Sequence, residues 1–264
     1  MYRKSKIKER IIFLSLIILF MPFILQAQDS LKHETDKGKW SFLVEPYLLF
    51  PNMNGTVGVG ELPDLSVDAS PGDIFSKLKM GAMLNLEASN DKWAIATDFI
   101  YMDLKQDVTP GTVISSGKVT AKQFAWELAG LRRVTPWLEI GAGGILNAVT
   151  SGADINVKNI GGGTTNRNGE VSATWFDPML IARIKNAPGK KFIYQFMGEV
   201  GGFGIGSDFA WQVQAYAGYR FSKLFQVTGG YRIISLDYEK GSGDSRFLYD
   251  VDTFGPSIRF GFNF

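Results

Sequence analysis

The residues that could do chemistry in this chain are charged groups, because it has no thiol and a single imidazole. Its 264 residues include 28 Lys and Arg, 26 Asp and Glu, one histidine and no cysteine. The lack of cysteine excludes disulfides, thiolate metal sites and a thiol nucleophile. The histidine, His33, lies in a polar N-terminal segment outside every predicted strand, so a serine–histidine pair is not expected. We therefore predict no catalytic site, no metal site and no cofactor.

Thirteen charged residues share one property: they fall on the polar face of segments in which polar and apolar residues alternate. Seven are acidic and six are basic. They are Glu45, Lys79, Glu87, Asp98, Glu127, Arg133, Glu139, Asp177, Arg183, Glu199, Arg220, Arg232 and Arg259. If these faces line one narrow interior, opposite charges should pair, since an unpaired charge away from bulk water costs several kcal/mol or so. We expect arginines to bridge carboxylates across that interior.

Alternation with a period of two residues predicts the strands that position these charges. It is clearest at the C-terminus, where one face carries Phe254, Pro256, Ile258, Phe260, Phe262 and Phe264. Ten such segments are predicted, at 39–50, 78–89, 92–104, 118–134, 136–150, 171–186, 191–203, 209–222, 224–239 and 246–264. Three of them contain a proline in their interior, at Pro46, Pro178 and Pro256, where we expect bulges or local breaks because proline cannot donate to the ladder.

The lengths of the segments and of their connections indicate the fold. Strands of about 9–11 residues with an apolar and a polar face are typical of outer-membrane barrels. The connections alternate between short turns and longer stretches such as 51–77, 105–117 and 151–170. We therefore predict an all-β, transmembrane, antiparallel up-and-down β-barrel of about ten strands, with eight and twelve as alternatives. Residues 71–78, preceded by Ser70 as a cap, predict a short helix in the first extracellular loop.

The first 27 residues have the pattern of a secretory signal peptide. Five basic residues and one acidic residue precede a charge-free run of about 15 residues, which is short for a membrane-spanning helix. Without residues 1–27 the counts become 23 basic and 25 acidic, so the net charge changes from +2 to −2. We expect no nucleic-acid partner. The predicted organisation is a signal peptide at 1–27, a periplasmic stub at 28–38 and a barrel at 39–264 with both termini periplasmic; an uncleaved anchor helix is the alternative.

Three segments resemble a widespread family of small outer-membrane β-barrel proteins of Gram-negative bacteria. They are 92–104 (KWAIATDFIYMDL), 198–209 (GEVGGFGIGSDF) and 229–238 (GGYRIISLDY). The resemblance implies the fold and the bacterial outer membrane as location, and it implies no activity. Phe260, Phe262 and Phe264 look like the C-terminal signal read by the barrel-assembly machinery. That machinery, outer-membrane lipid and lipopolysaccharide are the expected partners.

The function predicted from these patterns is that of an integral outer-membrane barrel, structural or weakly pore-forming, with a charge-paired and occluded lumen. We expect no enzymatic activity. Two alternatives stay open. One is a narrow porin for small solutes. The other is a surface receptor or adhesin that binds through the loops at 51–77 and 151–170.

Overall fold

The computed structural model describes residues 39–61, 63–108, 114–158, 163–186 and 189–264. The predicted signal peptide, the periplasmic stub and His33 lie outside these residues. In the part of the chain that is described, no helix has both the length and the apolar character needed to cross a membrane.

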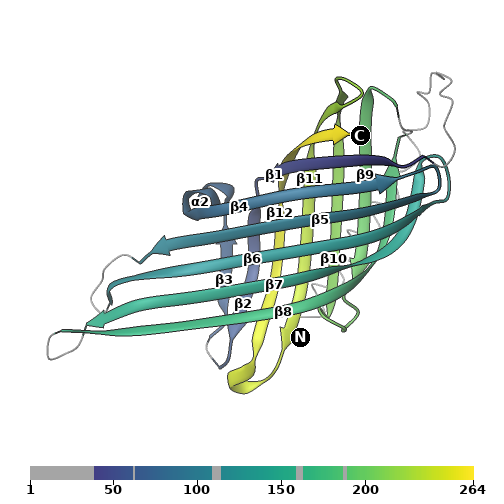
Figure 1. Cartoon of the computed structure of the whole chain (residues 1–264). Helices are drawn as coiled ribbons and strands as arrows, with labels where there is room; N and C mark the ends of the chain where they lie inside the picture. The colour runs from purple at the N-terminus through teal and green to yellow at the C-terminus, as the bar shows by residue number, and fades with distance from the viewer. Residues whose placement is uncertain (1–38, 62, 109–113, 159–162, 187–188) are drawn as a thin grey trace. The chain divides into compact units, whose positions relative to one another are not determined.

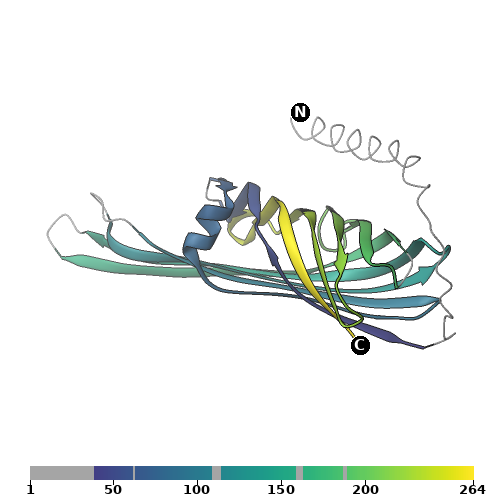
Figure 2. The same ribbon diagram turned by 90° about the horizontal axis from the view of Figure 1, so that it is seen from above.

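Ten antiparallel strands form a closed ring (Figure 1), which confirms the predicted fold class. Each strand pairs with the next around the ring, and the last pairs with the first. In ring order they are β1 (Ser41–Leu49), β4 (Leu78–Ser89), β5 (Trp93–Asp107), β6 (Ile114–Arg133), β7 (Leu138–Lys158), β8 (Thr164–Lys185), β9 (Phe192–Gly201), β10 (Phe209–Arg220), β11 (Phe225–Lys240) and β12 (Phe247–Asn263). In Figure 2 the long teal strands form one wall and the green and yellow strands face them.

The segment predicted as the first long loop, 51–77, contains three further elements. Strand β2 (Asn52–Val59) pairs with the same strand as β1. The C-terminal half of β12 pairs with β1, and its N-terminal half pairs with β2. Strand β3 (Leu65–Ala69) completes a hairpin with β2. The predicted short helix is confirmed as α2 (Pro71–Lys77), in which Ser70 and Asp73 form a capping box. The prediction of a loop was therefore wrong for the β2–β3 hairpin. A 3₁₀ turn, η2 (Gly243–Ser245), joins β11 to β12.

Burial alternates along the strands with the predicted period. In β8, Asp177, Met179 and Arg183 are buried, whereas Phe176 and Leu180 are 51% and 56% exposed. Because successive side chains of a strand point to opposite faces, one face of each strand lines the interior and the other forms the outer wall. The inner face carries the polar residues together with buried apolar ones such as Met179, and large apolar residues cover the outer wall.

The three prolines lie where one neighbouring strand stops pairing, and none of them shifts the register. Pairing of β1 with β12 has a gap at Glu45 and Pro46, and pairing of β8 with β9 begins one residue after Pro178. Pro256 lies opposite the junction between β1 and β2. Proline is tolerated at these points because the ladder needs no N–H there on one side. The expected local breaks are present, but the bulges lie elsewhere, at Leu78/Met80 and Ile114/Ser116.

Strands β6, β7 and β8 are 20, 21 and 22 residues long, about twice the length of β9. Their distal parts, 114–123, 149–158 and 164–173, form what we call the projecting sheet (Figure 1). Most of the predicted loops at 105–117 and 151–170 are therefore strand. The polar/apolar contrast that marks a barrel strand is weak in this sheet, because most of its residues are exposed or half-buried.

Candidate functional site

A cluster of five side chains around Arg232 connects distant walls of the barrel; we call it the Arg232 cluster. The guanidinium donates to the Asp98 carboxylate and, at 3.0 Å, to the Tyr47 hydroxyl. It also donates to the Gln212 carbonyl oxygen at 2.8 Å, and the Gln212 amide donates to Glu127 at 2.8 Å. All five side chains are buried. The cluster is therefore a continuous hydrogen-bonded chain of two acids, one base and two neutral groups.

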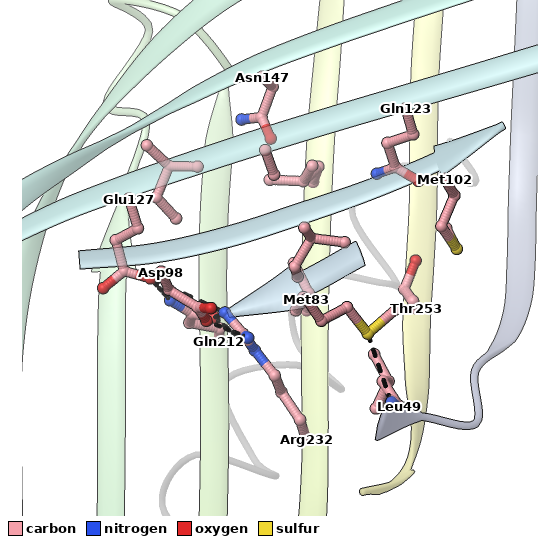
Figure 3. Close-up of a pocket in the computed structure, with 15 residues that line it drawn as sticks. Leu49, Met83, Asp98, Met102, Gln123, Glu127, Asn147, Gln212, Arg232 and Thr253 are labelled. Atoms are coloured by element: carbon pink, nitrogen blue, oxygen red, sulfur yellow. Dashed lines mark hydrogen bonds and ion pairs between the residues drawn. The ribbon is translucent and has the colours of Figure 1, made fainter. Parts of the chain in front are cut away.

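The position of these residues in the ring shows why the contacts span the interior (Figure 3). Asp98 is on β5 and Arg232 is on β11, and three strands separate these two by the shorter way around the ring of ten. Side chains from such nearly opposite strands meet only if both point inward and reach across the bore. The alternation in β5 and β11 provides the inward direction, and the length of arginine provides the reach.

A second cluster, the Arg183 cluster, connects β4 with β6, β7 and β8. The Arg183 guanidinium donates to Glu87 and, at 2.8 Å, to Glu139. The Lys185 ammonium lies 2.9 Å from Glu87 and 3.3 Å from Glu139, and Arg133 lies 3.0 Å from Glu139. Three basic groups thus face two carboxylates. The Arg183 and Glu139 side chains are 3% and 2% exposed, so this ion-pair network is desolvated.

Arg259 on β12 forms a third connection. Its guanidinium lies 4.1 Å from the ring centre of Tyr216 and 4.8 Å from that of Tyr47, so it contacts the faces of two aromatic rings. It donates to the Tyr216 hydroxyl at 2.9 Å and to Gln214 at 3.0 Å, and it lies 3.5 Å from Glu45. Tyr47 therefore contacts both guanidinium groups and connects Arg259 to the Arg232 cluster.

Two buried acids depart from the expected pairing with bases. Asp177 accepts hydrogen bonds from the Ser207 backbone N–H at 2.6 Å, the Ser207 hydroxyl at 2.9 Å, the Trp175 indole at 3.0 Å and the Asn147 amide at 3.1 Å. All four donors are neutral, and the two from Ser207 attach the β9–β10 turn to β8. Glu199 is 3% exposed, and neither of its carboxylate oxygens has a hydrogen-bond partner among the described residues.

Two predicted bases also lie outside the ion-pair clusters. Lys79 sits at the β-bulge of β4, its side chain is 66% exposed, and it pairs with Asp103 at 3.3 Å. The bulge breaks the two-residue alternation from which Lys79 was assigned to the interior. Arg220 donates to the Gln226 side chain at 2.9 Å, and Gln226 in turn donates to Glu45 at 3.2 Å. Its described partner is thus an amide and not a carboxylate.

A cavity of about 40 Å³ adjoins the Arg232 cluster (Figure 3). One side is formed by Asp98, Glu127, Gln212 and Arg232, and aliphatic and methionine side chains such as Met83 form much of the rest. By volume it can hold about two or three water molecules. In the described part of the chain, no group of three His, Cys, Asp or Glu residues is placed to hold a metal ion.

The prediction omitted the neutral members of the clusters. Gln212, Gln214 and Tyr216 lie on the polar face of a predicted strand, and Tyr47 shares a face with Glu45, but only ionisable groups were counted. Lys185 was also missed, although it lies two residues after Arg183 and therefore on the same face. Counting every polar side chain of correct parity would have found all of these residues.

The three C-terminal phenylalanines lie at the seam between the first and last strands. The Phe264 backbone exchanges two hydrogen bonds with Phe42, at 2.8 and 3.0 Å. The Phe262 ring lies 5.5 Å from that of Phe225, and Phe260 and Phe264 are 36% and 71% exposed.

Comparisons with known proteins agree with this architecture. Neither the family models nor the curated proteins searched give a match to the chain. Among solved structures, the outer-membrane protease OmpT from Escherichia coli aligns with a TM-score of 0.50 at 11% identity, covering 90% of this chain and 100% of that one. Ail, the attachment invasion locus protein of Yersinia pestis, aligns with a TM-score of 0.35 at 13% identity (85% and 98% covered), and the Pseudomonas putida toluene transporter TodX with 0.35 at 8% (87% and 90% covered). The described part of this chain therefore has the fold of a small outer-membrane β-barrel protein.

Proposed function

We propose that the chain is an integral outer-membrane protein whose lumen is closed by its own side chains, and that its role is structural rather than that of an open pore. The outer wall supports insertion in a membrane. Large apolar side chains such as Ile95, Leu128, Ile140 and Leu180 are each about half exposed on different strands. A soluble protein of this size would bury most of these groups, whereas lipid solvates them.

Aromatic residues at one end of the barrel support its orientation. Trp93, Trp137, Phe192, Phe221 and Phe264 lie near the short turns or the C-terminus, and their side chains are 40–71% exposed. Such a ring matches an interfacial girdle. The start of β1 and the end of β12 pair at the same end, so we place both ends of the barrel on the periplasmic side.

The observation that carries the proposed closure is the pair of arginines that reach across the bore. Arg232 connects β11 to β5, and Arg183 connects β8 to β4. The side chain of each of these two arginines is 3% exposed. A solute could pass only by separating these desolvated ion pairs, which costs several kcal/mol or so.

Recording of single channels in planar bilayers tests this proposal. The wild-type protein should be silent. The quadruple variant E87A/D98A/R183A/R232A removes both partners of each bridge, and it should produce conductance steps. The matched control K79A/D103A removes an ion pair outside the clusters and should remain silent.

Folding of each variant is checked beforehand by circular dichroism and by the shifted gel mobility of folded barrels. Steady conductance of the wild-type protein would refute closure and would favour the narrow porin. A folded but silent quadruple variant would show that the two arginine bridges are not the barrier, against the role proposed for them.

A surface-binding role through 51–77 and 151–170 is the second candidate. The projecting sheet favours it, because most of 151–170 lies on exposed strands beyond the short strands of the barrel. The projecting sheet does not help to close the lumen, so its length favours a separate role. Its first test is whether the sheet associates with another polypeptide.

A further inference from the structure

Strand β8 has a long edge that no strand among the described residues pairs with. It pairs with β7 from Thr164 to Ile184, but with β9 only from Met179 onward. The turn between β9 and β10 reaches up to Phe176, where Gly206 lies against its carbonyl group. From Asn166 to Thr174, no described strand covers the other side of β8. We call this segment the β8 edge.

The backbone direction at the β8 edge follows from its continuation into the barrel. The Pro178 carbonyl points toward β9, where it accepts a hydrogen bond from Gly202 at 3.1 Å. Because this direction alternates along a strand, every even-numbered residue of the edge presents its N–H and C=O to the open side. The odd-numbered residues use theirs to pair with β7. The edge is thus a ready-made hydrogen-bonding template.

Natural proteins usually protect such edges by short length, lysine, proline or a bulge. Another free edge of this sheet, β3, follows that rule: it has five residues and runs directly into Ser70 and Pro71. The β8 edge does not follow it. Its sequence, NRNGEVSAT, contains no lysine and no proline, and its register with β7 is continuous. The Asn166 amide donates to Asp154 at 2.7 Å, which holds the edge in place.

We propose that the β8 edge pairs in an antiparallel manner with the β8 edge of a second copy of this chain, about a two-fold axis at Gly169. This register places Asn168 opposite Glu170 of the second copy, twice by symmetry, so each amide can donate to a carboxylate. Centring the axis on Arg167 would place two arginines opposite each other, and centring it on Glu170 would place two carboxylates opposite each other. The charges of the edge therefore select a register near Gly169.

Gly169 suits the axis for two reasons. Two facing glycines let the strands approach without a side-chain clash, and nothing lies within 4 Å of the place where a Cβ would be. Its backbone φ also lies outside the left-handed region, so other residues are tolerated there. Within Asn166–Thr174, the paired edges would exchange about eight backbone hydrogen bonds between even-numbered residues.

Antiparallel pairing turns the second copy by 180°, so the two barrels lie at opposite ends of the joined sheet. If each barrel lies in a membrane, which rests on the proposed function, the pair bridges two membrane surfaces. The pairing itself does not depend on that location, so the two statements can be tested separately.

Cysteine cross-linking of the full chain in detergent tests the pairing, since the chain has no cysteine of its own. The variant G169C places two thiols on the axis, where facing Cα atoms about 4.5 Å apart allow a disulfide. It should form a covalent dimer on mild oxidation. The matched variant V171C lies on the same face two residues further along the strand, but its two copies lie about 14 Å apart in this register, and it should remain monomeric. A monomeric G169C, or equal cross-linking of both variants, would overturn the proposal and would leave the edge to a strand of a different protein.

Charge variants at Asn168 give a second measurement, by analytical ultracentrifugation. N168E places a carboxylate opposite Glu170 of the other copy, twice by symmetry, and should weaken dimerisation about tenfold. N168K places an ammonium group there and should strengthen dimerisation. The double variant N168E/E170K restores opposite charges and should recover the wild-type affinity, which a merely damaged sheet would not do. Failure of that recovery would contradict the register. Clustering of proteoliposomes tests the bridging alone: dimers that form in detergent without clustering vesicles would refute bridging and leave the pairing intact.

Discussion

Replacing Arg232 by methionine should destabilise the barrel more than any conservative change of its partners. Methionine keeps much of the volume of the side chain but removes four hydrogen bonds, to Asp98, Tyr47 and twice to Gln212. Asp98 and Glu127 then remain buried without a base. Breaking a buried ion pair by removing one partner costs about 3–5 kcal/mol of folding stability. Because R232M leaves two buried acids without a base, we expect its loss at the upper end of that range.

Replacing the acid instead of the base, in D98N, should cost less folding stability. Arg232 would keep its hydrogen bonds to Tyr47 and Gln212 and its contact with Glu127 at 3.8 Å. We expect a loss of about 1–3 kcal/mol for D98N. The two variants should thus differ by about 2 kcal/mol, which corresponds to about thirtyfold in the unfolding equilibrium constant. The double variant D98N/R232M should be more stable than the sum of both losses implies, by about 1–2 kcal/mol.

Urea unfolding of the protein in lipid vesicles, followed by fluorescence of its six tryptophans, measures these free energies. K79M is the matched control, because it removes the basic group of an ion pair whose lysine is 66% exposed, and it should cost less than about 1 kcal/mol. A loss for R232M no larger than that for D98N, or two losses that add without coupling, would contradict this prediction. Either result would mean that the guanidinium is solvated rather than held across the bore.

Three further predictions concern contacts outside the Arg232 cluster. Hydrogen bonds from Arg246 lower the pKa of Asp64. This contact therefore stabilises the fold above the ordinary carboxyl pKa, and its contribution is lost as the pH falls through the lowered value. In R246Q, an NMR titration should show the pKa of Asp64 rising, and an unchanged midpoint would contradict the contact. S70A removes the side-chain cap of α2 and should cost about 1 kcal/mol of local stability, seen as faster amide exchange confined to this helix; exchange equal to wild type would show that the cap is dispensable. D177N turns one acceptor into a donor facing the Ser207 hydroxyl, so the β9–β10 turn should become more sensitive to protease, whereas a turn as resistant as wild type would argue against this anchor.

The sequence predicted the barrel wall well because lipid and lumen impose opposite demands on alternate residues. In the last strand, Phe254 to Phe264 and the residues between them mark the two faces without ambiguity. The same contrast identified Asp98, Glu127 and Arg232 as candidates for one face. It failed at Lys79, where a bulge changes the parity, and in 151–170, where water contacts both faces of the sheet and no contrast remains.

The period of the sequence by itself determined that this chain forms strands, which side chains share a face, and that a capped turn of helix follows Ser70, since all three depend on residues near one another in the chain. Only the tertiary structure decided that Arg232 meets Asp98, that Arg183 meets Glu87, and that β8 runs past β9 to leave an open edge. Those outcomes depend on how far each strand is shifted along its neighbours and on where the ring closes. Both are properties of ten strands together, because the contact of Arg232 with Asp98 across the bore joins residues 134 positions apart.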